Sequence, residues 1–516
     1  MIGYQLAIQA VQRPTQIALS YGAQHLTYLQ LYENACRVAN ALYADGVRPG
    51  DRVAVLLHNC NAFLEILFAC ALSGAIFVPI NFRLVGREVA MVLNACTPRL
   101  LLAGETFADM LSQITSDSLG RTIRWVNDGP PQSPTGWEDA HTRWRDAHTP
   151  PLPQSTIPSD TLLILLHSSG TTGLPKGIMH SHATTLASCS SKIIDLELKP
   201  TDATVVFGPL FHAGPLMDLT LPLLLRGGRV VLGASRQFDP QQLLQAIAAY
   251  RVTVVPIYPT MLRRLLETPE DAGLDLSSLR LIITGGESAP IPVIQGVHKR
   301  FPTVAFYNNY GSTDGGPVTT FLAPELSRNR MGSVGKESFS VQVRIVDESG
   351  QTVAPEVIGE LIVRSPFVCL GYWRRPQESA AQLRDGWWYT GDLAYRDADG
   401  FIWIAGRSKD MVKSGTENIY PIEVEQVIAT LPGVTEVAVI GVPDAYWGES
   451  VAAYVVIKPD ATLTAQAIVA HCREHLASYK KPRHVVFVDS LPRGTTNKVN
   501  KNRLRQMWSE AAQPPA

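Results

Sequence analysis

Residues 167–177, with the sequence HSSGTTGLPKG, combine glycines, hydroxyl side chains and a lysine in one short stretch. The glycines allow unusual backbone dihedrals and let the main chain approach an anion closely. The hydroxyls donate hydrogen bonds, and the lysine adds a positive charge. This combination predicts a loop that holds the β- and γ-phosphates of ATP. The residues predicted to do so are Ser168, Ser169, Gly170, Thr171, Thr172, Gly173 and Lys176.

The loop is not a Walker A motif, because that pattern requires GxxxxGK followed by Ser or Thr, and the sequence contains no such segment. From these residues alone, a solvated bend at Pro175 is the structural alternative. Three further segments hold glycines and polar residues: 284–289 (TGGESA), 307–316 (YNNYGSTDGG) and 389–392 (YTGD). Taken in isolation, each suits a structural turn as well as a binding loop.

The segment SSGTTGLPKG resembles the signature of the adenylate-forming superfamily, which contains acyl- and aryl-CoA synthetases, luciferases and the adenylation domains of peptide synthetases. The later motifs of that superfamily follow in the same order, so the resemblance covers essentially the whole chain. It implies a ligase that uses ATP and Mg²⁺ to convert a carboxylic acid to an acyl-AMP. It also implies that the acyl group then passes to coenzyme A.

The resemblance also implies contacts to the nucleotide. Tyr310 corresponds to the residue that stacks on adenine, and Asn308 to the one that hydrogen-bonds its amino edge. Thr313 corresponds to a contact with the α-phosphate. Further residues expected in the nucleotide site are Gly286, Glu287 and Gly311.

Two carboxylates have separate implied roles. Asp392 lies where the superfamily binds both ribose hydroxyls, with help from Arg407. Asp314 stands where the superfamily usually has a glutamate that binds magnesium, and magnesium prefers such oxygen ligands. Because aspartate is shorter by one methylene, a bridging water can replace the direct contact. This departure bears on the geometry of the metal site and leaves its charge unchanged.

The C-terminal motifs resemble the superfamily with two departures. Lys498 corresponds to the adenylation lysine. Such a residue stabilises the charge of the transition state and raises the rate by on the order of 10²–10³. Asn497 precedes it where glycine is usual, and asparagine tolerates left-handed backbone. Lys409 falls at the hinge position about which the smaller domain turns. Thr416 replaces a glycine in the loop that lines the pantetheine tunnel, and its β-branch constrains that loop.

His212, in PLFHAGPL, falls where an aromatic residue or histidine borders the acid pocket and gates it, so we assign it to both catalysis and substrate binding. The other candidates for this pocket are small and apolar, with no obvious cation to pair a second carboxylate. They suit a medium- to long-chain fatty acid, or an aryl or alicyclic acid. The residues are Ala213, Gly214, Gly315 and Gly316, with Pro215, Gly311, Pro317 and Val318 beside them.

Two other functions are compatible with the resemblance. A carrier-protein-loading adenylation enzyme would pass the acyl group to a carrier's phosphopantetheine, although no fused carrier domain is present. A non-catalytic AMP-binding sensor is disfavoured by the retention of Lys498 and Asp392. An amino acid substrate is disfavoured because residues 211–214 lack the aspartate that holds an ammonium group.

Histidine pairs give no prediction of a metal site. His180 and His182 have no third ligand nearby in the sequence. His471 and His475 share a helix face, but no HExxH motif is present. We therefore expect no zinc at either pair.

Composition limits the remaining functions. With 516 residues the chain exceeds one compact core, which predicts two or more domains. A net charge of −1 gives no basic excess for nucleic acid or for an anionic membrane. The seven cysteines form no CxxC pair, and no signal peptide is apparent, so a cytoplasmic location without a membrane span is expected. A homodimer is implied by the resemblance alone.

The elements that would position these residues follow an α/β pattern. We predict a helix over residues 28–45, a buried strand over 51–57, and a helix running into a strand over 63–80. The phosphate loop is expected between a strand at 161–166 and a helix from Ser181. Further βα units extend to about residue 308, and short antiparallel strands fill 340–405.

The predicted fold class is α/β, with two domains. Residues 1–406 form a large N-terminal domain of parallel α/β sheets with a small β-barrel-like subdomain. Residues 407–516 form a small, mobile α+β C-terminal domain with its hinge near residue 409. Within it we expect helices at 421–431 and 463–478 and a basic tail after the strand HVVFV.

Overall fold

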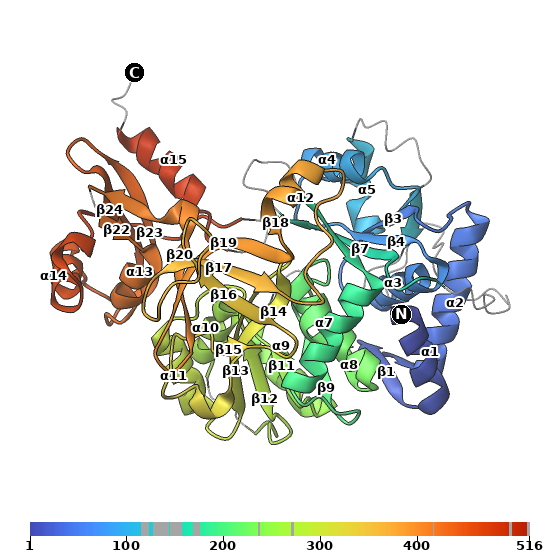
Figure 1. Ribbon diagram of the computed structural model, residues 1–516. Coiled ribbons are helices and arrows are strands. Elements are labelled where there is room, and N and C mark those ends of the chain that lie inside the picture. The colour runs from blue at the N-terminus through green and yellow to red at the C-terminus, as the bar shows by residue number, and fades with distance from the viewer. Residues whose placement is uncertain are drawn as a thin grey trace.

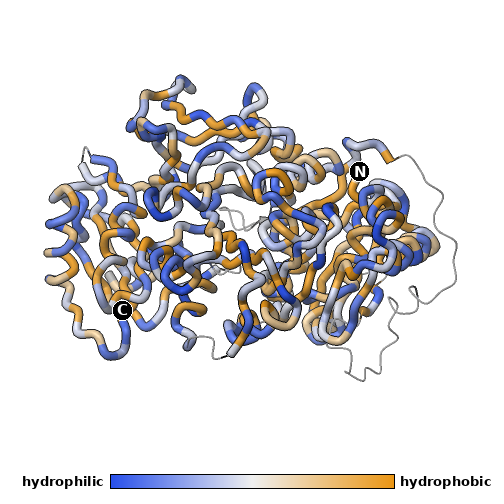
Figure 2. The backbone as a smooth tube through the Cα atoms, turned by 90° about the horizontal axis from the view of Figure 1, so that it is seen from below, coloured by the Kyte–Doolittle hydropathy of each residue, from blue (hydrophilic) through white to orange (hydrophobic). Residues whose placement is uncertain are grey.

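The computed structural model describes residues 1–114, 123–126, 144, 157–168, 176–235, 238–269, 273–415, 417–494 and 498–512. The strands of these residues form five sheets. Figure 1 shows a large body coloured from blue to light orange and a smaller, darker orange to red body at the C-terminal end. Figure 2, turned by 90°, again places the two chain ends on opposite sides of the molecule. The predicted α/β class, with a large N-terminal and a small C-terminal domain, is confirmed.

A six-stranded sheet carries the start of the predicted phosphate loop. Its order is β6-β5-β3-β4-β7-β8, and the pairs are parallel except for β7 with β8. Strands such as β3, with its apolar RVAVL run, are buried because helices cover the sheet. The strands are β3 (Arg52–Leu56), β4 (Ile76–Pro79), β5 (Leu100–Gly104), β6 (Ile123–Val126), β7 (Leu162–Ser168) and β8 (Lys176–Ser181). The helices of this region are α2 (Tyr28–Ala44), α3 (Asn61–Ser73), α4 (Gly86–Cys96), η1 (Glu105–Phe107) and α5 (Ala108–Ser112).

Two further sheets complete the core of the large domain. In one, β1, β10 and β9 are parallel and β2 is an antiparallel edge. Its strands are β1 (Ile17–Tyr21), β2 (Gln24–Thr27), β9 (Ala203–Val206) and β10 (Arg229–Leu232). In the other, β11, β12 and β13 are parallel and β14 and β15 continue antiparallel. Its strands are β11 (Val254–Pro256), β12 (Leu281–Thr284), β13 (Ala305–Ser312), β14 (Gly316–Leu322) and β15 (Lys336–Glu337).

Helices connect and cover these two sheets, and a shared apolar core fixes their places. One of them, η3, is a π-helix, a form that is frequent at functional sites. They are α1 (Ile2–Gln12), α7 (His182–Asp195), η3 (Gly214–Thr220), α8 (Leu221–Arg226), α9 (Pro240–Tyr250), α10 (Pro259–Glu267), α11 (Ile291–Arg300) and η4 (Pro324–Leu326).

An antiparallel sheet follows, as the short strands at 340–405 predicted. Its order is β16-β17-β19-β18, with β20 paired to β19. Gly400, at a φ of 86°, turns the chain between β19 and β20. The elements are β16 (Gln342–Val346), β17 (Gly359–Arg364), α12 (Pro376–Gln382), β18 (Leu383–Arg384), β19 (Trp387–Arg396), β20 (Ile402–Arg407) and η5 (Ser408–Asp410).

The small domain packs helices on its own mixed sheet, in the order β22-β21-β24-β23 with β25 parallel to β24. A separate apolar core around Val424, Val439 and Val455 holds it together. Its strands are β21 (Val412–Ser414), β22 (Glu417–Ile419), β23 (Val434–Asp444), β24 (Gly448–Ile457) and β25 (His484–Phe487). Its helices are α13 (Pro421–Ala429), α14 (Ala465–His475), η6 (Ser478–Lys480) and α15 (Lys501–Ala512).

Three expectations about local structure were wrong. The segment after the phosphate loop begins with strand β8, because Lys176–Ser181 pairs with β7 in antiparallel register. The helix expected from Ser181 is confirmed, since Ser181 caps α7, but the intervening strand places its N-terminus one strand length, about 20 Å, from the start of β8. Residues 307–312 are part of β13, because they pair with the aromatic and β-branched residues of β14. The expected basic tail is helix α15, because Leu504 is fully buried against the sheet of the small domain.

Candidate active site

A cleft of about 1370 Å³ runs between the two domains. Pockets for one small ligand typically have about 300–1,000 Å³, so this cleft has room for more than one substrate. Most of the described site residues predicted from the sequence line it. They are Lys176, His212, Ala213, Gly286, Glu287, Asn308, Tyr310, Gly311, Thr313, Asp314, Asp392, Arg407, Lys409 and Lys498.

The floor of the cleft is built at the carboxyl ends of the parallel strands β12 and β13, where α/β sheets commonly bind ligands. Thr284 and Asn308 are register partners there, which places the TGGESA and YNNYG segments side by side. The buried Asn308 amide donates to the Ser333 carbonyl at 2.9 Å. This leaves the side-chain oxygen of Asn308 as an acceptor, the group that an adenine amino edge requires.

Asp392 and Arg407 are neighbours across the β19–β20 ladder, although fifteen positions separate them in the sequence. Arg407 Nε lies 3.3 Å from Asp392 Oδ1, and the Tyr310 hydroxyl donates to Asp392 Oδ2 at 2.6 Å. Asp392 is buried and Arg407 is half-exposed. Burial and the Asp392 charge raise the pKa of Tyr310 well above its ordinary value, so its hydroxyl stays a donor.

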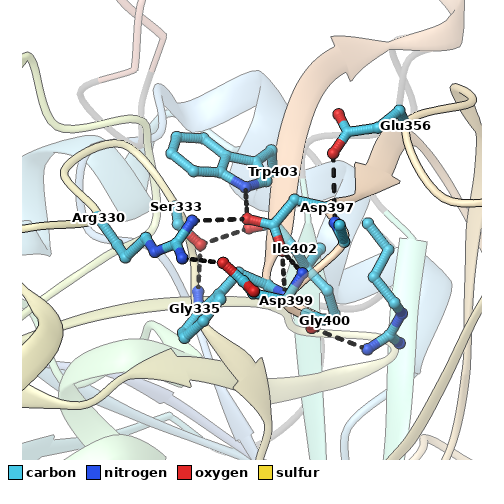
Figure 3. A network of polar contacts seen from close by, with 12 residues as sticks. Arg330, Ser333, Gly335, Glu356, Asp397, Asp399, Gly400, Ile402 and Trp403 are labelled. Atoms are coloured by element: carbon cyan, nitrogen blue, oxygen red, sulfur yellow. Dashed lines mark hydrogen bonds and ion pairs between the residues drawn. The ribbon is translucent and has the colours of Figure 1, made fainter.

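A polar network holds the β19–β20 hairpin against the segment that carries Ser333 (Figure 3). Arg330 donates to Asp397 at 3.3 Å and also pairs with Asp399. The Trp403 indole donates to the same Asp397 oxygen at 3.0 Å. The Ser333 hydroxyl donates to the Ile402 carbonyl at 2.8 Å. The strands that present the Asp392 pair and the segment that binds Asn308 are therefore fixed to each other.

Lys176, at the start of β8, faces the turn that carries Asp314. Its Nζ lies 2.6 Å from Glu378 Oε2 and 4.8 Å from the centre of the Tyr372 ring. Burial raises the pKa of Asp314, while a hydrogen bond from Tyr372 and the Lys176 charge oppose that rise.

Asp314 fits the predicted magnesium site by the chemistry of its donor group. Magnesium is usually held by one or two carboxylates together with substrate phosphates. Asp314 offers one carboxylate to the cleft, and Lys176 beside it suits the same phosphates.

Lys498 enters the cleft from the small domain. Although its side chain is solvent-accessible, desolvation by the cleft walls lowers its pKa, and the charge of Arg407 adds to this. Glu287 and Asp392 favour its charged form. Burial raises the pKa of Glu287, against the attraction of Arg493 and Lys498. The lysine thus interacts electrostatically with two carboxylates that line the same cleft.

His212 and Ala213 also line the cleft, and the part of the cleft around them is called its acid end below. Burial lowers the pKa of His212 to about 4, and the charges of Lys498 and Arg83 act in the same direction. The imidazole is therefore neutral near pH 7, which suits a wall of an apolar acid pocket. Its ring lies 5.6 Å from that of Phe211.

An ion bridge joins the two domains beside this site. Glu436 on β23 lies 2.8 Å from Arg263 of the large domain and 2.8 Å from Arg493 of the small one. This shared carboxylate holds the small domain in the arrangement that brings Lys498 to the cleft.

Comparisons with known proteins agree with this geometry. The family model described as AMP-binding enzyme matches residues 6–373, and that described as AMP-binding enzyme C-terminal domain matches residues 423–498. The chain belongs to the AMP-binding enzyme family. It is similar to a feruloyl-CoA synthase of Amycolatopsis sp, with 39% identity over 97% of each chain. It is also similar to an indoleacetate–CoA ligase of Aromatoleum aromaticum, with 38% identity over 96% of this chain and 95% of that one.

Among solved structures, the chain resembles the o-succinylbenzoate CoA synthetase of Bacillus subtilis in complex with ATP and a magnesium ion. The TM-score is 0.83 and the identity 30%, over 97% of this chain and 98% of that one. Together with the named relatives, this similarity identifies the protein as an AMP-forming acid–CoA ligase.

Three glycines assigned to the acid pocket do not line the cleft. Gly214 is the first residue of the π-helix η3. Gly315 and Gly316 are buried in the turn between β13 and β14, where a Cβ on Gly316 would lie 2.6 Å from the Phe367 ring. In the ligase these three positions lie beneath the residues that line the cleft.

Several predictions lie outside the described residues. They concern residues 169–173 of the phosphate loop, the replacement of glycine by Thr416, and Asn497 before the adenylation lysine. Ser168 is the last residue of β7.

Three polar residues near His212 were missed in the sequence: the buried Lys192 and Asp218, and Tyr258, whose hydroxyl is buried. A single carboxylate inside the apolar run PLMDLTLPLLL was a usable signal for Asp218. Lys192 gave no such signal, because a lysine near the end of a helix is ordinarily exposed.

Proposed function

We propose that the ligase carries out two half-reactions in this one cleft. In the first, the carboxylate of the acid attacks the α-phosphorus of ATP, the bond to pyrophosphate breaks, and acyl-AMP forms. In the second, the thiol of coenzyme A attacks the acyl carbonyl and AMP leaves. The observation that carries the proposal is that Lys498 of the small domain lines the same cleft as Asp392 and Tyr310 of the large one.

The side chains divide the work along the cleft. Asp392 and Arg407 suit the ribose, and Asn308 suits the adenine edge. Lys498 would stabilise the negative charge that develops between the acid carboxylate and the α-phosphate. Lys176 would bind the outer phosphates. Magnesium, held by Asp314, would neutralise phosphate charge when bound.

We propose an aryl acid as the substrate, with an alicyclic or a medium- to long-chain fatty acid as the alternative. The support comes from the neutral His212 and the apolar Phe211 and Ala213 that line the cleft beside it. Two of the relatives are named for feruloyl and indoleacetate, which favours the aryl class.

We propose Lys409 as the hinge between domains 1–406 and 407–516. It lies in η5 directly after β20, between the segments matched by the two family models. A homodimer is a further prediction, which light scattering of the purified ligase measures. None of the described helices is long and apolar enough to span a bilayer.

The test is a comparison of the half-reactions in Lys498→Ala. We expect acid-dependent ATP–pyrophosphate exchange to fall by on the order of 10²–10³ while thiolysis of supplied acyl-AMP is retained, because the lysine stabilises charge only in the first step. Product mass spectrometry identifies the thioester and AMP. Lys299→Ala, on the exposed side of α11, is the matched control. An equal loss in both half-reactions would contradict the assignment of Lys498.

A further inference from the structure

A tyrosine and an aspartate converge behind the acid end of the cleft. A Cβ on Gly214 would lie 2.6 Å from the Tyr258 hydroxyl and 3.5 Å from Asp218 Oδ2. Gly214 follows His212 and Ala213, which line the cleft. The Tyr258 ring also lies 3.8 Å from the position of a Cβ on Gly286, another lining residue. The two polar groups therefore lie directly behind the cleft wall.

Neither group has its hydrogen bonds completed by the protein. Within the part of the chain that the structure describes, the Tyr258 hydroxyl and Asp218 Oδ1 are buried without a hydrogen-bond partner. Asp218 as a whole is 9% exposed. A buried polar group without a partner costs about 1–3 kcal/mol, and more when it is charged. This cost is removed when a water or a polar group of a ligand supplies the missing partner.

A buried lysine stands beside them. Lys192 on α7 is fully buried, and its Nζ donates to Ser188 Oγ at 2.8 Å. Burial lowers the pKa of Lys192 and raises that of Asp218, while the attraction between the two charges opposes both shifts. A cavity of about 10 Å³ is lined by Lys192, Asp218 and Asn309, and Asn309 also lines the cleft. Asn309 thus separates this small cavity, which Lys192 and Asp218 line, from the cleft.

We infer that Tyr258 and Asp218, supported by Lys192, form a polar end of the acid pocket, and that the acid carries a neutral hydroxyl group remote from its carboxylate. A hydroxyl donates to Asp218 and accepts from Tyr258, so it completes both groups at once. A second carboxylate would be repelled by Asp218. An alkyl end would leave both groups unpaired. The inference rests on the proposed function and narrows its substrate class.

The experiment uses pairs of acids that differ by one hydroxyl. We would measure kcat/KM for pyrophosphate exchange with 4-hydroxycinnamate and cinnamate, with 4-hydroxyphenylacetate and phenylacetate, and with an ω-hydroxy fatty acid and its plain counterpart. The wild-type ligase should favour the hydroxylated member of at least one pair by on the order of 10²-fold or more, because a site built to bind a hydroxyl rejects the analogue that lacks it.

Tyr258→Phe should lower that ratio at least tenfold, by about 1.4 kcal/mol, because kcat/KM for the hydroxylated acid falls when the hydroxyl that donates to it is removed. Tyr454→Phe, in the small domain, removes a tyrosine hydroxyl that donates to the Leu504 carbonyl and does not line the cleft, so it should leave the ratio unchanged. An unchanged ratio in Tyr258→Phe would overturn the inference.

The wild-type ratios decide the question even if Tyr258→Phe does not fold. Equal use of both members of every pair would overturn the polar end of the pocket and leave the ligase activity intact. Absence of pyrophosphate exchange with every acid would instead contradict the proposed function.

Discussion

The two ends of the cleft satisfy their polar side chains in different ways. At the nucleotide end, Tyr310, Asp392 and Arg407 are bonded to one another before any substrate is present. At the acid end, Asp218 Oδ1 and the Tyr258 hydroxyl are buried and make no hydrogen bond to the described residues. The first end is organised by the protein itself, whereas the second depends on its ligand for completion.

This difference teaches where specificity resides. Groups that hold each other in place cost little reorganisation when ATP binds, so that end is suited to one invariant substrate. Unpaired buried groups discriminate between substrate acids. An acid without a matching polar group leaves them unpaired, and the free-energy cost of burying them remains. The two ends should therefore respond independently to mutation.

The largest expected effect follows from Asp392→Ala. The substitution leaves the Tyr310 hydroxyl and the Arg407 guanidinium without their common partner, so kcat/KM for ATP should fall by on the order of 10²–10³. Steady-state pyrophosphate exchange at varied ATP measures it. The preference for a hydroxylated acid should stay at its wild-type value. Asp275→Ala, an exposed partner of Arg251, is the control. A parallel collapse of acid preference would show that the two ends are coupled.

The sequence predicted the nucleotide end better than the acid end. The capped helix α2 and the change from α3 to β4 follow local patterns, and both were found within a few residues of their predicted bounds. Asp392 and Arg407 were assigned by resemblance to motifs. Their direct pairing across β19 and β20 is a property of strand register, which residue types alone do not specify.

The acid end could not be predicted because its charged residues are buried, whereas residues of these types are usually exposed. Lys192 and Asp218 are of types that are mostly exposed, and only the packing of α7 and η3 turns them inward. Leu504 gives the same lesson on a smaller scale, since contacts with the sheet, rather than the basic composition, decide that α15 is a helix. Tertiary contacts decide such positions, and local sequence does not contain them.

A smaller effect on stability is expected when the pH is lowered. Burial lowers the pKa of His212 and of His180 to about 4, below the ordinary value of 6.5 that an unfolded chain would show. The unfolded state therefore binds more protons between these values, so the stability is fully present above pH 6.5 and falls as the pH drops toward 4. Because His212 stays neutral near pH 7, kcat/KM should show no titration of it there.

Melting temperatures measured from about pH 7.5 to about pH 5 test this expectation. His180→Gln should flatten the decline, because one proton-linked difference between the folded and unfolded states is removed. His475→Gln, on the exposed end of α14, should leave the slope as in the wild type. Identical slopes in all three proteins would contradict a contribution from His180.

The smallest expected effect lies far from both ends of the cleft. Thr27 caps α2: its hydroxyl accepts from the Gln30 amide at 3.2 Å, and the Gln30 side chain accepts from the Thr27 amide at 2.9 Å. Thr27→Ala removes the first bond and should lower the free energy of unfolding by about 1 kcal/mol, measured by urea denaturation. Because the cap contacts neither the Asp392 cluster nor Asp218, kcat/KM for ATP and the hydroxyl preference should both match the wild type. A change in either would mean that the ends of the cleft respond to global stability, and the contrast between them would then lose its local basis.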